Sequence, residues 1–263
     1  MITDSSAIVN FNQEKFLAPY RQVNAFFYKN CILCDAMATQ DFCDACFKHL
    51  PAIPVRHCPV CLSAFASSQV LAHPLQICGA CLAKPPAYDT TIAALTYTFP
   101  VDALIHALKY QARLAIAPIL AKLLIEKLRH IEIAHKPDLI IPMPLHPRRL
   151  RERGFNQALE IARYVARALK IEIIPEGCKR TRNTPPQTEL PWKLRQKNVR
   201  NAFSCTLDLS GRHIVIIDDV MTTGATLNAL AHQLRIKGAA TVSNWVIARA
   251  QIDQLKTELD SNF

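Results

Sequence analysis

The 263-residue sequence lacks the features that would set it apart from ordinary globular proteins. No apolar run approaches the ~20 residues that a helix needs to span a bilayer. The first residues, which include Asp4 and Glu14, lack the basic-then-apolar pattern of a secretory signal. Internal repeats and low-complexity segments are missing too, apart from recurring cysteine pairs. Because 50% of the residues are hydrophobic and 20% charged, we expect a globular, cytoplasmic protein without membrane insertion.

One segment of the chain is poor in bulky apolar residues. The segment between about residues 30 and 86 has few bulky apolar side chains and cannot hold a large core. It contains instead eight of the ten cysteines, as four Cys-x-x-Cys pairs: Cys31 and Cys34, Cys43 and Cys46, Cys58 and Cys61, Cys78 and Cys81. In a reducing compartment such pairs are poor disulfide candidates and good thiolate ligands for a metal. Four pairs within this short segment argue against a redox dithiol and favour structural zinc.

The cysteine pairs predict two Zn²⁺ sites with four thiolates each, because each tight turn directs two sulfurs at one ion. Sequential pairing is the simplest arrangement, with eight and sixteen residues between the paired turns. Nested and crossed pairings remain open. Structural zinc contributes about 10–16 kcal/mol in small peptides, enough to hold a segment with so little core. Cys178 and Cys205 stand apart, and we expect them to be small buried residues.

The stretch IVIIDDVMTTGAT, from Ile214 to Thr226, combines a strand, an acidic pair and a turn. Its four leading apolar residues predict a buried strand, and Asp218 and Asp219 follow where that strand should end. The hydroxylic turn that comes next consists of Thr222, Thr223, Gly224, Ala225 and Thr226, and an amphipathic helix follows. Main-chain N–H groups at a helix start favour a phosphate, and adjacent carboxylates can accept hydrogen bonds from vicinal hydroxyls. The stretch therefore predicts a site for a sugar phosphate.

The remaining pattern predicts an α/β domain after a boundary at Pro85-Pro86. We expect strands at 91–99, 138–142, 171–174 and 241–248. We expect helical segments at 101–131, where a new helix starts at Pro118, and at 155–170. A short helix at 192–199 and a loosely attached helix at 251–263 complete the prediction. Strands alternating with helices predict a mainly parallel sheet with helices on both faces. The domain assignment is 26–86 for a zinc-binding domain and 87–250 for the α/β domain, with 1–25 and 251–263 peripheral.

Basic residues gather in two segments that we expect to be loops around the predicted site, one after His146 and one at 178–200. Residues 146–200 hold fourteen Lys and Arg against five acids, whereas the whole chain carries a net charge of +10. The basic residues selected as nucleic-acid contacts are Arg148, Arg149, Arg151, Arg153, Arg180, Arg182, Lys193, Lys197 and Arg200. A solvated basic face is the alternative, and recognition of pyrophosphate or a nucleic acid is the functional interpretation.

Lys109 is expected to be a solvated residue on a helix, with a position facing the site as the alternative.

The stretch at Ile214–Thr226 resembles the thirteen-residue PRPP-binding motif of type I phosphoribosyltransferases. The chain as a whole, from about residue 26 to 250, resembles the ComF (ComFC) family of competence proteins. This resemblance rests on the cysteine pairs, the PRPP motif, Leu108-Lys109-Tyr110, Pro142-Met143-Pro144-Leu145-His146, Arg153-Gly154-Phe155-Asn156-Gln157, Thr184 with Gln187 and Leu190, Arg195 with Asn198-Val199, and Ala202-Phe203. It implies a type I phosphoribosyltransferase-like parallel sheet flanked by helices, preceded by a small Cys-rich zinc-binding domain.

The family implies that Mg²⁺ and PRPP bind, and that a nitrogen nucleophile attacks C1 of the ribose as pyrophosphate leaves. Asp218 and Asp219 are then the candidate catalytic residues, and the turn from Thr222 to Thr226 holds the 5′-phosphate. The pyrophosphate loop corresponds to Pro142, Met143, Pro144 and Leu145, and Arg195 in the 178–200 excursion would cover the leaving group. Members are associated with uptake of single-stranded DNA in natural transformation, so single-stranded DNA and other competence proteins, such as a DNA translocase, are expected partners.

One departure limits the substrate. Enzymes that act on 6-oxopurines usually place a carboxylate in the phosphate loop, and here that position is Thr222. No general base for a purine is therefore visible, and the acceptor stays unidentified. Three hypotheses follow: a PRPP-binding protein acting in DNA uptake, a DNA-binding protein with PRPP as a regulatory ligand, and a nucleotide-salvage transferase.

Overall fold

The computed structural model describes residues 29–65, 76–131, 136–182 and 202–251, and its contacts divide the chain into two compact units, Met1–Leu50 and Pro51–Phe263. The first unit contains the antiparallel strands β1 (Lys29–Asn30) and β2 (Met37–Ala38) and the helix α2 (Asp44–Lys48). The predicted helices at 192–199 and at the C-terminal tail lie outside the described residues, the tail except for Gln251. No helix among the described residues is long and apolar enough to cross a membrane.

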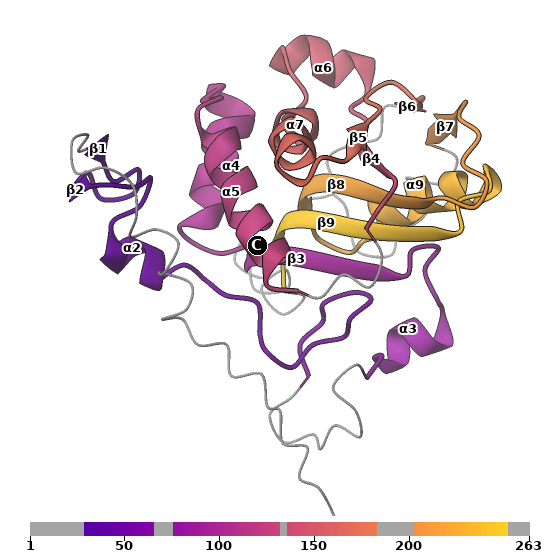
Figure 1. Ribbon diagram of the computed structural model, residues 1–263, viewed down its shortest axis with the longest axis horizontal. Helices are drawn as coiled ribbons and strands as arrows, with labels where there is room; N and C mark the ends of the chain where they lie inside the picture. Colours follow the sequence, from indigo (N-terminus) through magenta and orange to yellow (C-terminus); the bar gives the residue numbers. More distant parts are fainter. Residues whose placement is uncertain (1–28, 66–75, 132–135, 183–201, 252–263) are drawn as a thin grey trace, which may run out of the picture. The chain divides into compact units, whose positions relative to one another are not determined.

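The second unit is built on a five-stranded, entirely parallel sheet (Figure 1). Its order is β3 (Thr90–Thr96), β9 (Thr241–Arg249), β8 (His213–Met221), β4 (Leu139–Pro142) and β5 (Glu172–Ile173). The central strands are continuously buried, as expected when helices cover both faces of a parallel sheet. This confirms the predicted parallel α/β architecture.

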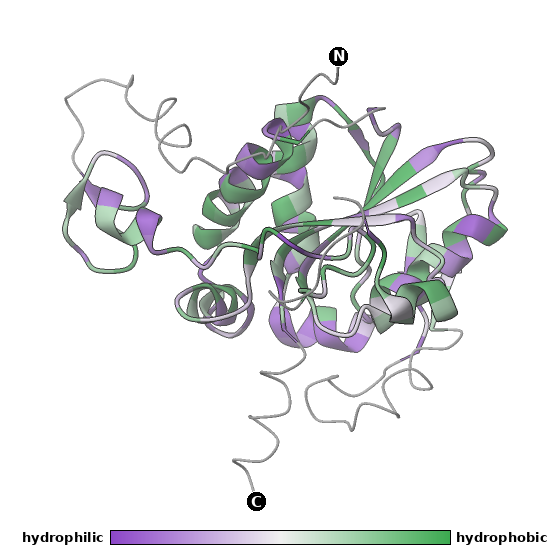
Figure 2. Cartoon of the chain, turned by 90° about the horizontal axis from the view of Figure 1, so that it is seen from below, coloured by the Kyte–Doolittle hydropathy of each residue, from purple (hydrophilic) through white to green (hydrophobic). Residues whose placement is uncertain are grey.

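Helices connect the parallel strands. They are α4 (Val101–Gln111), α5 (Ile116–Arg129), α6 (Pro147–Arg153), α7 (Gln157–Leu169) and α9 (Ala225–Ile236), and the short helix α3 (Gly79–Ala83) precedes β3. Figure 1 shows α7 above β8, with α4 and α5 beside it, and Figure 2 shows that the helices carry both hydrophobic and hydrophilic residues. Pro118 lies in the first turn of α5, where its missing N–H costs no hydrogen bond, so the predicted second helix is confirmed.

The antiparallel strands β6 (Cys178–Arg180) and β7 (Phe203–Cys205) form a separate two-stranded sheet. Cys178 and Cys205 face each other across this pair and are buried in the main core, as predicted. The ends of the predicted excursion therefore pair as a hairpin, and the residues 183–201 between them lie outside the description.

Two local expectations were wrong. The strand does not end before the acidic pair: β8 continues to Met221 because β9 keeps pairing with it up to Arg249. The arginine-dense segment after His146 is a helix, α6, and not a loop. The His146 side chain accepts a hydrogen bond from Arg148 N, Pro147 occupies the first helical position, and Gly154 ends the helix with φ 83°.

The order of the strands creates a switch point between β4 and β8. From β4 the chain crosses through α7 to β5 on one side, and from β8 it crosses through α9 to β9 on the other. Right-handed crossovers in opposite directions leave a crevice at the carboxyl ends of the two strands, which is where ligands bind in open parallel sheets. The loop after β4 and the turn after β8 both begin there.

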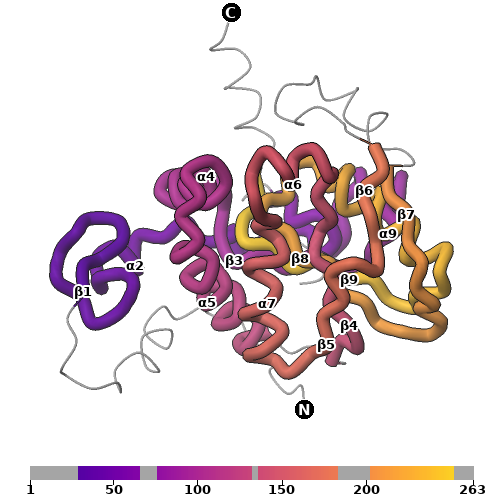
Figure 3. Tube along the Cα trace, turned by 90° about the horizontal axis from the view of Figure 1, so that it is seen from above, coloured from indigo at the N-terminus to yellow at the C-terminus, as the bar shows by residue number. Residues whose placement is uncertain are grey.

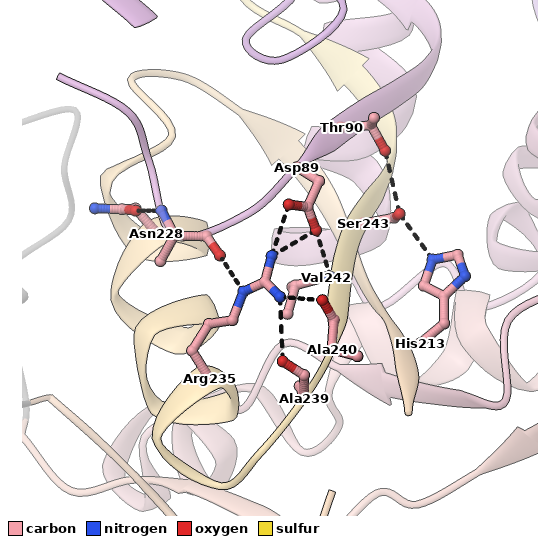
Figure 4. A network of polar contacts seen from close by, with 10 residues as sticks. Asp89, Thr90, His213, Asn228, Arg235, Ala239, Ala240, Val242 and Ser243 are labelled. Atoms are coloured by element: carbon pink, nitrogen blue, oxygen red, sulfur yellow. Dashed lines mark hydrogen bonds and ion pairs between the residues drawn. The ribbon is translucent and has the colours of Figure 1, made fainter. Parts of the chain in front are cut away.

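A polar network anchors the far end of α9 to the sheet (Figure 4). The guanidinium of Arg235 donates to the carbonyls of Ala87, Ala239 and Ala240 and pairs with both oxygens of Asp89, at 2.6 Å each. Asp89 also accepts a hydrogen bond from Val242 N. One side chain therefore ties the end of α9 to the starts of β3 and β9.

Replacement of Arg235 by lysine should lower the free energy of unfolding by ~1–2 kcal/mol, because one ammonium group cannot reach all these acceptors. Denaturant titration measures the change. The exposed pair of Arg163 and Glu160 on α7 offers a control, since Arg163→Lys preserves a surface ion pair worth little. Equal stability of the two variants would contradict an anchoring role for Arg235.

Candidate functional site

The two adjacent carboxylates lie buried at the switch point, immediately after β4 stops pairing with β8. Asp218 is 8% exposed and Asp219 3% exposed. Asp218 Oδ1 accepts a hydrogen bond from Asp219 N at 2.9 Å, and Asp219 Oδ1 accepts one from Val220 N at 2.7 Å. Asp219 Oδ2 forms an ion pair with Lys109 Nζ at 2.6 Å. The pair is therefore held in place from the main chain and from α4.

Burial governs the protonation of this cluster. It raises the pKa of Asp218, and the negative charge of Asp219 raises it further. Burial alone would lower the pKa of Lys109, but attraction to Asp219 and Asp218 outweighs it and the net pKa is raised. Lys109 thus stays charged and neutralises one of the two carboxylates, leaving the site suited to a further cation.

The expectation that Lys109 is a solvated residue was wrong. Its side chain is only 19% exposed, because the last turn of α4 directs it at the end of β8. The helical periodicity of this segment could not reveal the contact, since the carboxylate lies more than a hundred positions further along the chain. The neighbouring residue Tyr110 is 67% exposed, so one side of the end of α4 faces the site and the other faces solvent.

The predicted phosphate turn lies directly after the acidic pair. Gly224 has φ 76°, a conformation that favours glycine, and α9 begins at the next residue. Ala225 N donates to Thr223 Oγ1 at 3.2 Å, and Asn228 N donates to the Gly224 carbonyl at 2.8 Å. Thr222 and Thr226 are half-buried. A helix N-terminus preceded by hydroxyl groups is the arrangement that the sequence predicted for an anion.

The proline-containing loop after β4 lies against the same strand end. Met143 N donates to the Ile217 carbonyl at 2.8 Å, which brings the loop beside the residue that precedes the acidic pair. Asn156 Nδ2 donates to the Met143 carbonyl at 3.1 Å, while Asn156 Oδ1 accepts from Ala158 N and so caps α7. Pro142 pairs with Ile217 in the sheet. The structure thus brings together the β4 loop and the acidic pair.

Some of the basic residues predicted as nucleic-acid contacts lie around this end of the sheet. Figure 3 shows α6 between α4 and the β6–β7 hairpin. Arg148 and Arg151 of α6 are exposed, as is Arg182, while Arg149, Arg153 and Arg180 are partly buried. The guanidinium of Arg153 lies 5.4 Å from the ring centre of Tyr110, and that of Arg180 lies 5.6 Å from Phe203. Lys193, Arg195, Lys197 and Arg200 lie outside the described residues.

The eight paired cysteines form two clusters of four, with the predicted sequential pairing. Cluster 1 contains Cys31, Cys34, Cys43 and Cys46, and cluster 2 contains Cys58, Cys61, Cys78 and Cys81; within each, all sulfurs lie within 4.8 Å of one another. Zn–S bonds of about 2.3 Å put sulfurs ~3.8 Å apart in a tetrahedron. The distances Cys34 Sγ to Cys43 Sγ (3.7 Å) and Cys61 Sγ to Cys78 Sγ (3.6 Å) match this geometry. Both clusters could therefore hold zinc.

The clusters belong to different compact units. Cluster 1 lies in the unit that ends at Leu50, whereas cluster 2 lies in the unit that contains the parallel sheet. Cys58 is fully buried, and its neighbours Val60 and Leu62 join the core that α9 covers. The division into domains at residue 86 stays a prediction about which segments fold independently.

Sequence reasoning missed Arg249, which lies at the end of β9 and is 2% exposed. Its guanidinium donates to the carbonyls of Met221, Thr222 and Ala250, and its Nε donates to the Cys61 carbonyl at 2.8 Å. A charged residue directly after the predicted core strand at 241–248 was the available signal, because charged side chains are almost never fully buried without partners.

Known proteins match much of this chain. The model of the phosphoribosyl transferase domain family matches residues 107–261. The DNA utilization protein YhgH of Shigella flexneri is 38% identical, over 73% of this chain and 89% of that protein. Competence protein F of Haemophilus influenzae is 33% identical, over 86% and 99%. Among solved structures, a purine phosphoribosyltransferase of Pyrococcus horikoshii is 23% identical, over 50% and 70%, with a TM-score of 0.32.

Elemental analysis of the purified protein should find two zinc ions per chain. The double substitutions Cys34→Ser/Cys43→Ser and Cys61→Ser/Cys78→Ser should each lower the content to one, since each removes half of one ligand set. Loss of both ions in either variant would contradict two independent sites.

Proposed function

We propose that this chain, which belongs to the ComF family of proteins with a phosphoribosyltransferase domain, binds PRPP with Mg²⁺ and acts on single-stranded DNA during its uptake. The observation that carries the proposal is the buried pair of Asp218 and Asp219 beside a glycine turn that starts α9. The names of the two relatives, a competence protein and a DNA utilization protein, support the connection with DNA.

Each part of PRPP has a matching group at this end of the sheet. The N-terminus of α9, with Thr222, Thr223 and Thr226, suits the 5′-phosphate, because its main-chain N–H groups have no partners within the helix. The acidic pair suits the two ribose hydroxyls, which donate hydrogen bonds to carboxylates. The β4 loop, Pro142 to Leu145, and the nearby arginines suit the pyrophosphate.

The acidic pair also fits Mg²⁺. This ion prefers carboxylate oxygens, keeps several waters and bridges to phosphate oxygens. Asp218 and Asp219 supply two buried carboxylates, and Lys109 balances the charge of one of them. When bound, the ion would neutralise the pyrophosphate and so make it a better leaving group.

Transfer would break the bond between C1 of the ribose and the pyrophosphate oxygen and form a new bond from C1 to a nitrogen of the acceptor. Positive charge develops on the sugar as the first bond breaks, and the buried carboxylates lie where they can stabilise it. Residue 222 is threonine, so this chain offers no carboxylate in the phosphate turn to take a proton from a purine. The acceptor is therefore sought outside the 6-oxopurines.

The exposed arginines of α6 provide the proposed contact with DNA. Arg148 and Arg151 are exposed on a short helix beside the site, and Arg182 is exposed next to the β6–β7 hairpin. Such guanidinium groups bind backbone phosphates without reading sequence. A phosphate chain lying along α6 would pass the mouth of the PRPP site, which is a reason for one protein to combine both functions.

Calorimetry with Mg²⁺ and PRPP tests the ligand site. Asp218→Asn/Asp219→Asn should weaken binding at least 100-fold, equivalent to ~2.7 kcal/mol, because the hydroxyls and the cation lose both charged acceptors. Lys109→Met should weaken it less, and the surface control Arg163→Ala should bind as the wild type does. Unchanged affinity in the double variant would refute the site.

Pyrophosphate release, measured with nucleobases and with single-stranded DNA, separates a transferase from a protein that only binds PRPP.

Fluorescence anisotropy with single-stranded DNA at several salt concentrations tests the basic helix. Arg148→Ala/Arg151→Ala should weaken binding and reduce the slope of log affinity against log salt by about 1.4, since each lost phosphate contact removes ~0.7. The matched control is Arg163→Ala/Arg167→Ala, which removes two exposed arginines from α7. If both double variants change the slope equally, only net charge matters and α6 is no specific contact.

A further inference from the structure

Arg249 is a buried cation whose hydrogen bonds, within the described residues, all end on main-chain carbonyls. Three of these carbonyls, from Met221, Thr222 and Ala250, belong to the segments that leave β8 and β9. The fourth belongs to Cys61, a member of cluster 2. A single side chain therefore joins the first residue of the phosphate turn to a cysteine turn that is about 160 positions away in the sequence.

Tyr88 makes a second connection between the same two places. It is 5% exposed, and its hydroxyl lies 2.7 Å from the position that a Cβ on Gly224 would occupy. Tyr88 therefore packs directly on the glycine that starts α9. Tyr88 also shares a buried core with Cys58 of cluster 2, and Cys61 and Cys81 pack against that core.

The segment around Tyr88 is itself fastened to α9. Ala87 N donates to Asn228 Oδ1 at 2.6 Å, and the Ala87 carbonyl accepts from Arg235 Nε at 3.1 Å (Figure 4). Asn228 lies one turn into the helix. The chain that leaves cluster 2 after Cys81 thus runs along α9 before it enters β3.

The first cysteine turn of cluster 2 is bonded to the sheet edge through consecutive carbonyls. Thr91 N donates to the Pro59 carbonyl at 3.0 Å, and Thr91 Oγ1 donates to the Val60 carbonyl at 2.7 Å. With the bond from Arg249 to Cys61, three successive carbonyls of this turn are occupied. The position of the turn is therefore determined by β3 and β9 together, and it moves only if these bonds break.

Geometry links Arg249 to an intact cluster, because its Nε donates to the carbonyl of Cys61, a member of cluster 2. If cluster 2 came apart, Arg249 would lose the Cys61 carbonyl. A buried cation without partners is strongly unfavourable, so the side chain would move and release Met221 and Thr222.

We propose that Arg249 is a positioning residue that couples cluster 2 to the phosphate turn, so that binding of a sugar phosphate requires cluster 2 and not cluster 1. The coupling rests on the proposed function, since it concerns the same phosphate turn. Arg249 holds the carbonyls that precede Gly224, and Tyr88 packs on Gly224 itself. Cluster 1 lies in the other compact unit and serves as the control.

The experiment measures binding of Mg²⁺-PRPP, and of ribose 5-phosphate without metal, to full-length variants by calorimetry. Arg249→Lys should weaken both ligands by about tenfold, or 1.4 kcal/mol, and retain two zinc ions. An equal fold-change for ribose 5-phosphate identifies the phosphate turn, because this ligand lacks the pyrophosphate that Mg²⁺ bridges. The matched control is Leu128→Ala, which removes a buried side chain from the last turn of α5 and should lower stability without changing affinity.

The cysteine variants provide the second comparison. Cys61→Ser/Cys78→Ser should weaken ribose 5-phosphate binding at least tenfold, whereas Cys34→Ser/Cys43→Ser should bind it as the wild type does. Wild-type affinity in Arg249→Lys would overturn the coupling even if the cluster 2 variant did not fold. Equal losses of affinity in Arg249→Lys and Leu128→Ala would also overturn it, because they would reflect stability alone. Failure of the wild type to bind PRPP would instead overturn the proposed function.

Discussion

The separation of β4 from β8 after the pair of Pro142 and Ile217 is the constraint on which the site depends. β8 and β9 continue together for several more residues, whereas β4 turns away into its loop. One edge of β8 is thereby opened at Asp218, while the other edge keeps its hydrogen bonds to β9. The acidic pair can therefore be rigid and accessible from one side, a combination that a strand paired on both sides could not provide. The opposite directions of the α7 and α9 crossovers produce this opening, so it follows from topology and not from any single residue.

The electrostatic cost of the site is met by partners from distant segments. Two adjacent buried carboxylates repel each other and lose hydration, which is why the pKa of Asp218 is raised. Lys109 offsets this cost from α4, and the main-chain N–H groups of Asp219 and Val220 offset it locally. Lys109 neutralises Asp219, and Asp218, with a pKa raised to about 8, would lose its proton when a cation arrives with a polyphosphate. The same logic applies to Arg249, whose positive charge is held by the dipoles of four main-chain carbonyls.

The sequence predicted the parts of this structure that depend on local pattern. The buried strand before Asp218, the helix after the phosphate turn and the sequential grouping of the cysteines all follow from spacing over a few residues, and the structure agrees with them. The helix begins at Ala225, so it takes in the last two residues that were assigned to the turn. Contacts between distant segments could not be predicted in this way. Lys109 was assigned to solvent because periodicity gives the face of a helix but not what that face meets. Helix α6 was missed because repeated arginines suggested an exposed loop, although Pro147 and Gly154 mark the two ends of a helix.

The contrast between the two cysteine clusters shows why similar motifs need not have similar roles. Both have the same residue types at the same spacing within each pair, and both have sulfur distances suited to zinc. Cluster 2, however, contributes Val60 and Leu62 to the core beneath α9, and its Cys61 carbonyl receives a bond from the strand that carries Arg249. A metal there would stabilise a cysteine turn that β3 and β9 already hold through the carbonyls of residues 59 to 61. In the proposed coupling, Arg249 connects this turn to Met221 and Thr222, so loss of cluster 2 disturbs the phosphate turn.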